Sequence, residues 1–134
     1  MADDIVLHKL EIIEKCIKRI HEEYTADSLR NHQTKQDSIL LNLERACQAA
    51  IDMGMRICRL KRLGIPKESR DPFALMFEHK FISEDLQNKM FGLVGFRNTA
   101  VHNYKKLDLN IVEVIIKKHL IDFQNFGKIC VKIS

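Results

Sequence analysis

Apolar residues recur along this chain at intervals of three and four positions, the spacing that brings them onto one face of an α-helix. Between residues 3 and 24 the apolar stripe consists of Val6, Leu10, Ile13, Ile17, Ile20 and Tyr24. Asp3 and Asp4 stand at the start of this stripe, where the helix dipole favours negative charge. The pattern therefore predicts a first helix over residues 3–24.

A second helix is predicted to begin at about Ser28 or Lys35 and to run to Leu63. Its apolar line consists of Leu40, Leu43, Cys47, Ala50, Gly54 and Ile57. Gly64 follows as the expected C-terminal cap, and Pro66 stands where the helix can no longer continue.

Three more helices are predicted: Pro72 to Glu78, Ser83 to about His102, and residues 110–131. Asp71 stands before a proline at the first helical position, as an N-cap residue does. Asp108 and Asn110 are the candidate caps of the last helix. The chain is therefore expected to form a single domain over residues 1–134. Its fold class is all-α, an up-and-down bundle of four long helices and one short helix.

Composition supports this architecture. A chain of 134 residues has the length of one domain. It carries only five glycines and two prolines, too few turn-forming residues for a fold of many strands. The formal net charge of +4 is compatible with a phosphate-rich partner.

Basic residues are concentrated at the end of the predicted second helix, at Arg56, Arg59, Lys61 and Arg62. Two interpretations of this basic cluster remain open. Cations suit the C-terminal end of a helix dipole and are often simply solvated there. The alternative is a surface that binds the phosphates of RNA.

Nothing in the sequence indicates a metal, a cofactor or a membrane. The four cysteines are far apart and form no C-x-x-C pair, which favours reduced thiols in a cytoplasmic protein. The six histidines lack the spacing of metal ligands. No stretch approaches the roughly 20 apolar residues of a membrane span, and the N-terminus does not resemble a signal peptide.

The predicted fourth helix contains an anomaly. On an ideal helix that turns about 100° per residue, most of its apolar residues, including Val101, fall within about 80° of Leu86. Arg97 falls in the middle of this apolar arc. A buried, unpaired guanidinium costs several kcal/mol, so Arg97 is either paired inside the bundle or points into a seam that another molecule reaches. Asn98 and His102 are four residues apart on another side, where the amide can orient the imidazole.

The segment that runs from Gly92 to Tyr104 reads GLVGFRNTAVHNY. It resembles the signature of the HEPN superfamily, in which a histidine follows four to six residues after an arginine and a polar residue. Tyr104, two residues after His102, narrows the resemblance to the HepT-like toxins. Further matches are Ile51-Asp52, Gly64-Ile65-Pro66, Phe73 with Leu75, and Phe81-Ile82. The resemblance extends from about residue 40 to residue 110.

The resemblance implies a HEPN-like bundle that acts as the ribonuclease toxin of a toxin–antitoxin pair. It implies a homodimer in which two copies of the motif face one cleft. It also implies a nucleotidyltransferase antitoxin as partner, which neutralises the toxin by transferring AMP to Tyr104.

The motif residues suit metal-independent cleavage of RNA by attack of a 2′-hydroxyl. A histidine such as His102 can act as acid or base near neutral pH. A guanidinium such as that of Arg97 donates paired hydrogen bonds to phosphate oxygens. Asn98 would hold the imidazole or a phosphate oxygen. Tyr104 would donate a hydrogen bond or stack on a base, or would only pack at the helix end.

Two other functions remain open. The first is a HEPN-like module that binds RNA or a nucleotide without cleaving it. The second is a helical interaction adaptor in which Arg97 belongs to an ordinary buried ion pair with Asp52 or Asp37. The adaptor hypothesis predicts that Arg97→Ala unfolds the protein, whereas the other two predict that it keeps its fold.

Overall fold

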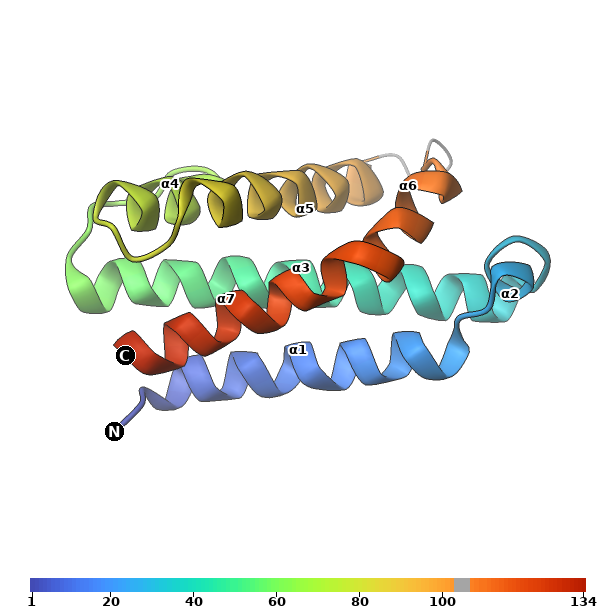
Figure 1. Cartoon of the computed structure of the whole chain (residues 1–134), viewed down its shortest axis with the longest axis horizontal. Helices are drawn as coiled ribbons and strands as arrows, with labels where there is room; N and C mark the ends of the chain where they lie inside the picture. The colour runs from blue at the N-terminus through green and yellow to red at the C-terminus, as the bar shows by residue number, and fades with distance from the viewer. Residues whose placement is uncertain (103–106) are drawn as a thin grey trace.

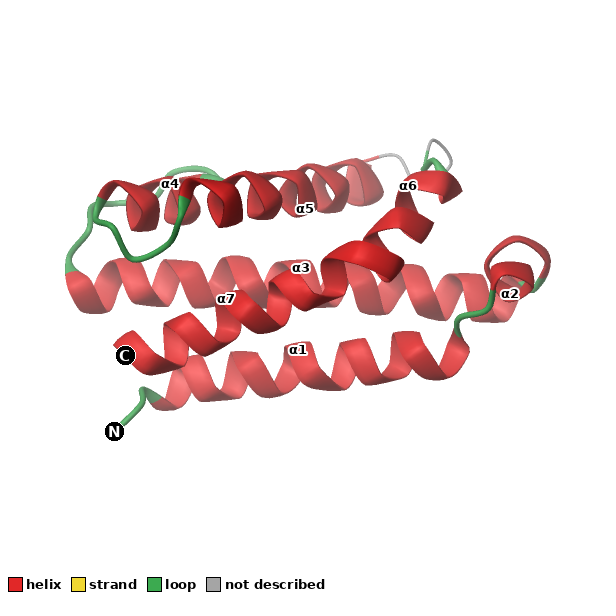
Figure 2. Cartoon of the chain, viewed as in Figure 1, coloured by secondary structure: helices red, strands yellow, loops and turns green. Residues whose placement is uncertain are grey.

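A computed structural model describes residues 1–102 and 107–134. Within these ranges all regular secondary structure is helical, which confirms the predicted fold class (Figure 2). The elements are α1 (Asp4–Glu23), α2 (Ala26–Asn31), α3 (Gln33–Lys61), α4 (Asp71–Glu78), α5 (Glu84–His102), α6 (Leu109–Val114), the π-helical segment η2 (Ile115–His119) and α7 (Leu120–Ile133). None of the described helices has both the length and the apolar character needed to cross a membrane.

Helix α3 runs through the middle of the bundle (Figure 1). It packs against α1, α2, α4, α5 and α7. In Figure 1, α1 lies along one side of α3 and α5 along the other, while α7 crosses between them. The largest fully buried side chains come from several helices and include Ile13, Leu43, Met53, Phe73, Phe123 and Phe126. One continuous core therefore holds α5 in place.

The start of α1 is fastened to α3 by a charged clasp. Asp3 is the N-cap of α1, as its carboxylate accepts hydrogen bonds from the backbone N–H groups of Ile5 and Val6. The guanidinium of Arg56 donates to both oxygens of the same carboxylate, at 3.1 and 2.8 Å. These hydrogen bonds, that of Arg56 foremost, lower the pKa of the Asp3 carboxyl. The first predicted helix is thus confirmed.

The second predicted helix begins close to Lys35, the later of its two predicted starts, because a separate short helix precedes it. Thr25 and Ser28 form a reciprocal capping box that begins α2. The chain then becomes extended at His32, and α3 begins one residue later. A capping box satisfies two backbone donors of a helix start, so α2 is stable as a separate short element.

Helix α3 also ends earlier than predicted. Its last residue is Lys61, and Arg62 takes the left-handed conformation with φ at 54°. The N–H of Leu63 then reaches back to the carbonyl of Cys58, and the Leu63 side chain is buried. Burial of Leu63 after a left-handed residue is typical of a Schellman cap, so Arg62 takes the position that was expected for Gly64.

Asp71 is not the N-cap that the sequence suggested. It is the first residue of α4. Its carboxylate accepts hydrogen bonds from the N–H groups of Lys67 and Glu68 instead. The side chain therefore closes the turn before α4 and leaves the helix start to Pro72, which needs no hydrogen-bond partner for its nitrogen.

The last predicted helix is a continuous helical path from Leu109 to Ile133 that contains a π turn. Asp108 caps its start, as its carboxylate accepts a hydrogen bond from the N–H of Asn110. The π-helical segment η2 inserts an extra residue into the turn, and such insertions are frequent at functional sites.

Gly54 marks the close approach of α3 to α4. A Cβ at this position would lie 2.8 Å from the Cβ of Pro72. We expect Gly54→Ala to lower the free energy of unfolding by about 1–3 kcal/mol, because the packed helices cannot give way. Denaturant unfolding measures this change.

Gly95→Ala is the matched control. A Cβ at Gly95 would meet no heavy atom within 4 Å, so this change should raise the free energy of unfolding by about 0.5–1 kcal/mol through helix propensity. If both variants had the same free energy of unfolding, the close approach at Gly54 would make no contribution to stability.

Candidate active site

Helix α5 carries the motif on a well-anchored scaffold. The hydroxyl of Ser83 accepts a hydrogen bond from the N–H of Leu86 and caps the helix start. The buried residues of α5 are Leu86, Met90, Leu93, Val94, Phe96 and Ala100. They confirm most of the predicted apolar arc. The exception is Val101, which was expected to be buried but is 47% exposed.

Arg97 is half-buried and has an unsatisfied donor. Its Nε atom is buried and has no hydrogen-bond partner, and its Nη1 lies 3.4 Å from the Oδ1 of Asn98. Burial raises the pKa of the Cys47 thiol on α3, and the positive charge of Arg97 opposes this shift. The guanidinium is therefore close enough to α3 to act on this thiol. No ion pair joins it to a carboxylate among the residues described.

The two aspartates proposed as its partner under the adaptor hypothesis interact with other groups. The carboxylate of Asp52 lies 3.1 Å from the Nζ of Lys9. Asp37 accepts a hydrogen bond of 2.8 Å from the side-chain amide of Gln33. Within the described part of the chain, neither forms a salt bridge with Arg97, so the structure gives no support to the adaptor interpretation.

Asn98 and His102 lie in the last two turns of α5. Asn98 is half-buried, and its carbonyl oxygen faces Arg97 in a long hydrogen bond. His102 is the last residue of α5. Tyr104 lies outside the described residues. The structure thus brings Arg97 and Asn98 together one turn before His102.

The basic cluster at the end of α3 lies far from this motif. Figure 1 shows the C-terminal end of α3 at the opposite end of the bundle from the C-terminal end of α5. Arg56 is occupied by its ion pair with Asp3, so it is not a free cation for RNA. The other three members, Arg59, Lys61 and Arg62, are exposed.

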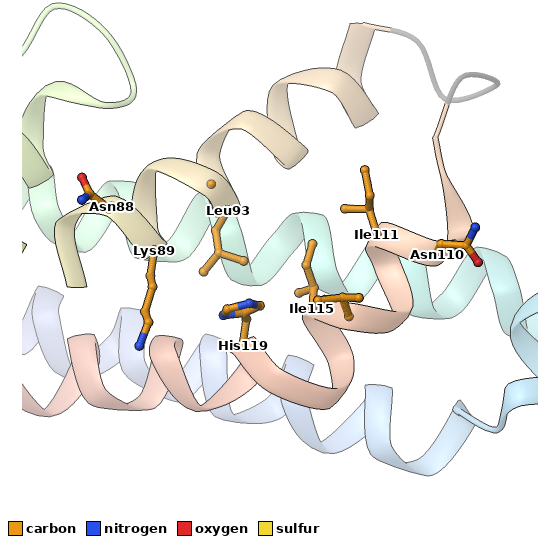
Figure 3. Close-up of a pocket in the computed structure, with 9 residues that line it drawn as sticks. Asn88, Lys89, Leu93, Asn110, Ile111, Ile115 and His119 are labelled. Atoms are coloured by element: carbon orange, nitrogen blue, oxygen red, sulfur yellow. The ribbon is translucent and has the colours of Figure 1, made fainter. Parts of the chain in front are cut away.

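The sequence did not point to a second feature, a groove on the other side of α5 (Figure 3). One cavity of about 450 Å³ is lined by residues that include Asn88, Lys89, Leu93, Ile111, Ile115 and His119. The Nδ1 of His119 lies 2.8 Å from a carboxylate oxygen of Asp122. The one sequence signal for this contact is the spacing of three residues between His119 and Asp122, which places both side chains on one face of a helix.

The described residues form no candidate metal site. Within residues 1–102 and 107–134, no three His, Cys, Asp or Glu side chains are placed so that they could hold a metal ion.

The family model described as Ribonuclease HepT-like matches residues 5–128. The chain belongs to the HepT-like ribonuclease family. This membership confirms the predicted resemblance and the predicted enzyme class, a ribonuclease.

Individual proteins that are similar to this HepT-like chain support the same family. It is 42% identical to the mRNA nuclease HepT of Shewanella oneidensis over 125 residues, which are 92% of this chain and 94% of that protein. It is similar to the tri-AMPylated Shewanella oneidensis HEPN toxin solved in complex with MNT antitoxin, with a TM-score of 0.91 and 40% identity over 98% of this chain and 99% of the other. It is also similar to a toxin–antitoxin crystal structure with AMP-PNP, with a TM-score of 0.89 and 40% identity over 96% of this chain and 98% of the other.

Proposed function

We propose that this HepT-like chain is the toxin of a toxin–antitoxin pair and cleaves RNA without a metal ion. The 2′-hydroxyl oxygen attacks the neighbouring phosphorus, the 5′-oxygen leaves, and the products are a 2′,3′-cyclic phosphate and a 5′-hydroxyl. The observation that carries this proposal is the guanidinium of Arg97, which is half-buried, lacks a carboxylate partner among the described residues and keeps one donor unsatisfied.

An unsatisfied buried donor costs about 1–3 kcal/mol. A phosphate oxygen that accepts from Arg97 would remove this cost and would form a charge-assisted hydrogen bond. The guanidinium is therefore suited to hold the scissile phosphate and to stabilise the charge that develops on it. Asn98, already in contact with Arg97, would orient this group.

His102 would transfer the protons. One imidazole can take the proton of the 2′-hydroxyl, and a second can give a proton to the leaving 5′-oxygen. A homodimer would supply both from one cleft. The exposed apolar side chain of Val101, one residue before His102, supports an interface at this end of α5.

We expect Arg97→Ala and His102→Ala each to reduce RNA cleavage by a factor of about 10² to 10⁴, because each removes one group that acts in the transition state. The measurement is cleavage of RNA in the presence of a chelator, with analysis of the product ends for the cyclic phosphate.

Controls separate a chemical effect from a structural one. Both variants should melt within a few degrees of the wild type, and light scattering should give twice the chain mass of 15.7 kDa for all three proteins. Full activity of His102→Ala would refute the mechanism. Unfolding of Arg97→Ala would favour the adaptor, and RNA binding without cleavage by the wild type would favour the binding module.

Control of this activity would come from a nucleotidyltransferase antitoxin. The Shewanella oneidensis relative is tri-AMPylated and was solved with its MNT antitoxin. We propose that Tyr104 is the residue that accepts AMP in this chain. The added phosphodiester would bring bulk and negative charge beside His102, and this charge would compete with RNA for Arg97.

Tyr104→Phe removes the hydroxyl that would accept AMP. After co-expression with the cognate nucleotidyltransferase, intact-mass measurement should show AMP groups on the wild type and none on Tyr104→Phe. The variant should keep much of its nuclease activity and escape neutralisation, unless the hydroxyl also takes part in cleavage. Equal adducts on both proteins would exclude this site.

The exposed members of the basic cluster are proposed to hold RNA at a distance from the cut. We expect the double variant Arg59→Ala/Lys61→Ala to bind RNA more weakly and to flatten the dependence of log K on log salt by roughly one unit per lost phosphate contact. Fluorescence anisotropy in the His102→Ala background measures both quantities.

The matched control is Lys15→Ala/Lys18→Ala, which neutralises two exposed lysines of α1. Arg56 stays unchanged because it clasps Asp3. If the salt dependence of Arg59→Ala/Lys61→Ala equals that of the control, the cluster is only a solvated helix end.

A further inference from the structure

The groove of Figure 3 lies on the side of α5 that faces away from Val101. Gly92, which lines it, is about 180° round an ideal helix from Val101. The cavity of about 450 Å³ between α5 and the helical path of α6 and η2 presents a mainly apolar surface, together with the polar groups of Asn88, Lys89, Asn110 and His119. Cavities of roughly 300–1,000 Å³ with apolar walls and a few polar groups are typical of ligand sites.

A buried carboxylate orients one of these polar groups. Asp122 is 3% exposed, and its Oδ2 lies 2.8 Å from the Nδ1 of His119. This contact fixes the ring and leaves Nε2 as the nitrogen available to a ligand. His119 is the last residue of the π-helical segment η2, so the direction of its ring depends on the extra residue in that turn. Asn88 and Lys89 line the same cavity from α5.

The wall formed by α5 is open at two glycines. Gly92 and Gly95 are exposed, and a Cβ at either position would have no heavy atom within 4 Å. A second hollow of about 390 Å³ is also lined by Gly92 and Ile111, and it extends along α5 to Thr99. Gly92 and Ile111 thus line both hollows, and Thr99 stands three residues before His102 in the sequence.

We propose that the His119 cavity binds one unstacked nucleobase of the RNA substrate. This inference rests on the proposed function and adds to it a subsite that recognises a base. Single-stranded RNA is read by packing splayed-out bases on flat surfaces and by hydrogen bonds to their edges. The bare backbone at Gly92 supplies an open surface, and Asn88 and His119 supply donors and acceptors for the edge.

Charge favours RNA over an apolar segment of a protein as the occupant. Lys89 makes a salt bridge of 2.9 Å with Asp85 and remains partly exposed at the mouth of the cavity. An apolar helix seated there would take the Lys89–Asp85 ion pair and the His119–Asp122 contact out of water without adding hydrogen bonds, which is unfavourable. A nucleotide instead offers them a phosphate and polar base atoms.

The test is Gly92→Leu, which fills the groove at an exposed helical position. Leucine has a higher helix propensity than glycine, so the variant should fold. Binding of short RNA oligomers of a single base is measured by fluorescence anisotropy in the His102→Ala background. We expect the parent protein to prefer some bases, and Gly92→Leu to lose this preference and to bind roughly tenfold more weakly.

Asn125→Leu is the matched control, because Asn125 is an exposed residue of α7 that lines neither hollow. Unchanged affinity and base preference in Gly92→Leu would overturn the proposal. So would a change of oligomeric state in Gly92→Leu by light scattering, since the groove would then be an interface between copies. Cleavage by the wild type is measured separately, so the proposed function and the base subsite can each fail alone.

Discussion

Helix α3 must bury its surface against five other described helices at once, and this packing sets the positions of Arg56 and of helix α5. Because α1 covers one side of α3, the clasp of Asp3 and Arg56 forms there. Because α5 covers the other side, the guanidinium of Arg97 is close enough to Cys47 of α3 to affect the pKa of its thiol. A helix packed in this way cannot rotate to hide the guanidinium or to expose it fully. Burial of the apolar face of α5 thus accompanies a half-buried Arg97 whose Nε has no hydrogen-bond partner.

The periodicity of apolar residues determined which parts of the fold were predictable. Stripes at spacings of three and four define helices and their buried faces, so the first helix and most of the arc on α5 were predicted correctly. Helix ends depend on local competition between caps. Because Leu63 is buried, the left-handed residue that ends α3 is Arg62 and not Gly64. The spacing of apolar residues does not predict this position. Val101 was misjudged because an ideal helical arc does not show where the neighbouring helices stop.

The candidate site was predictable where it rests on a motif and unpredictable where it rests on distant contacts. Arg97 stood out because a charge interrupts an apolar arc. The ion pair of Arg56 joins residues 53 positions apart in the sequence, so it was invisible before the fold was known. The cavity at His119 was missed because a π turn leaves the local apolar pattern intact, since Ile115 and Ile116 are still buried.

The two sides of α5 have different physical characters, and this difference suits the two tasks of a nuclease. The side with Arg97 and Asn98 offers charged and polar donors close to a packed helix, where charge that develops on a phosphate can be stabilised. The side with Gly92 and Gly95 offers an open, apolar groove, where bases can pack with little dependence on charge. Because both sets of residues belong to α5, this helix fixes the distance between Arg97 and the wall of the groove at Gly92.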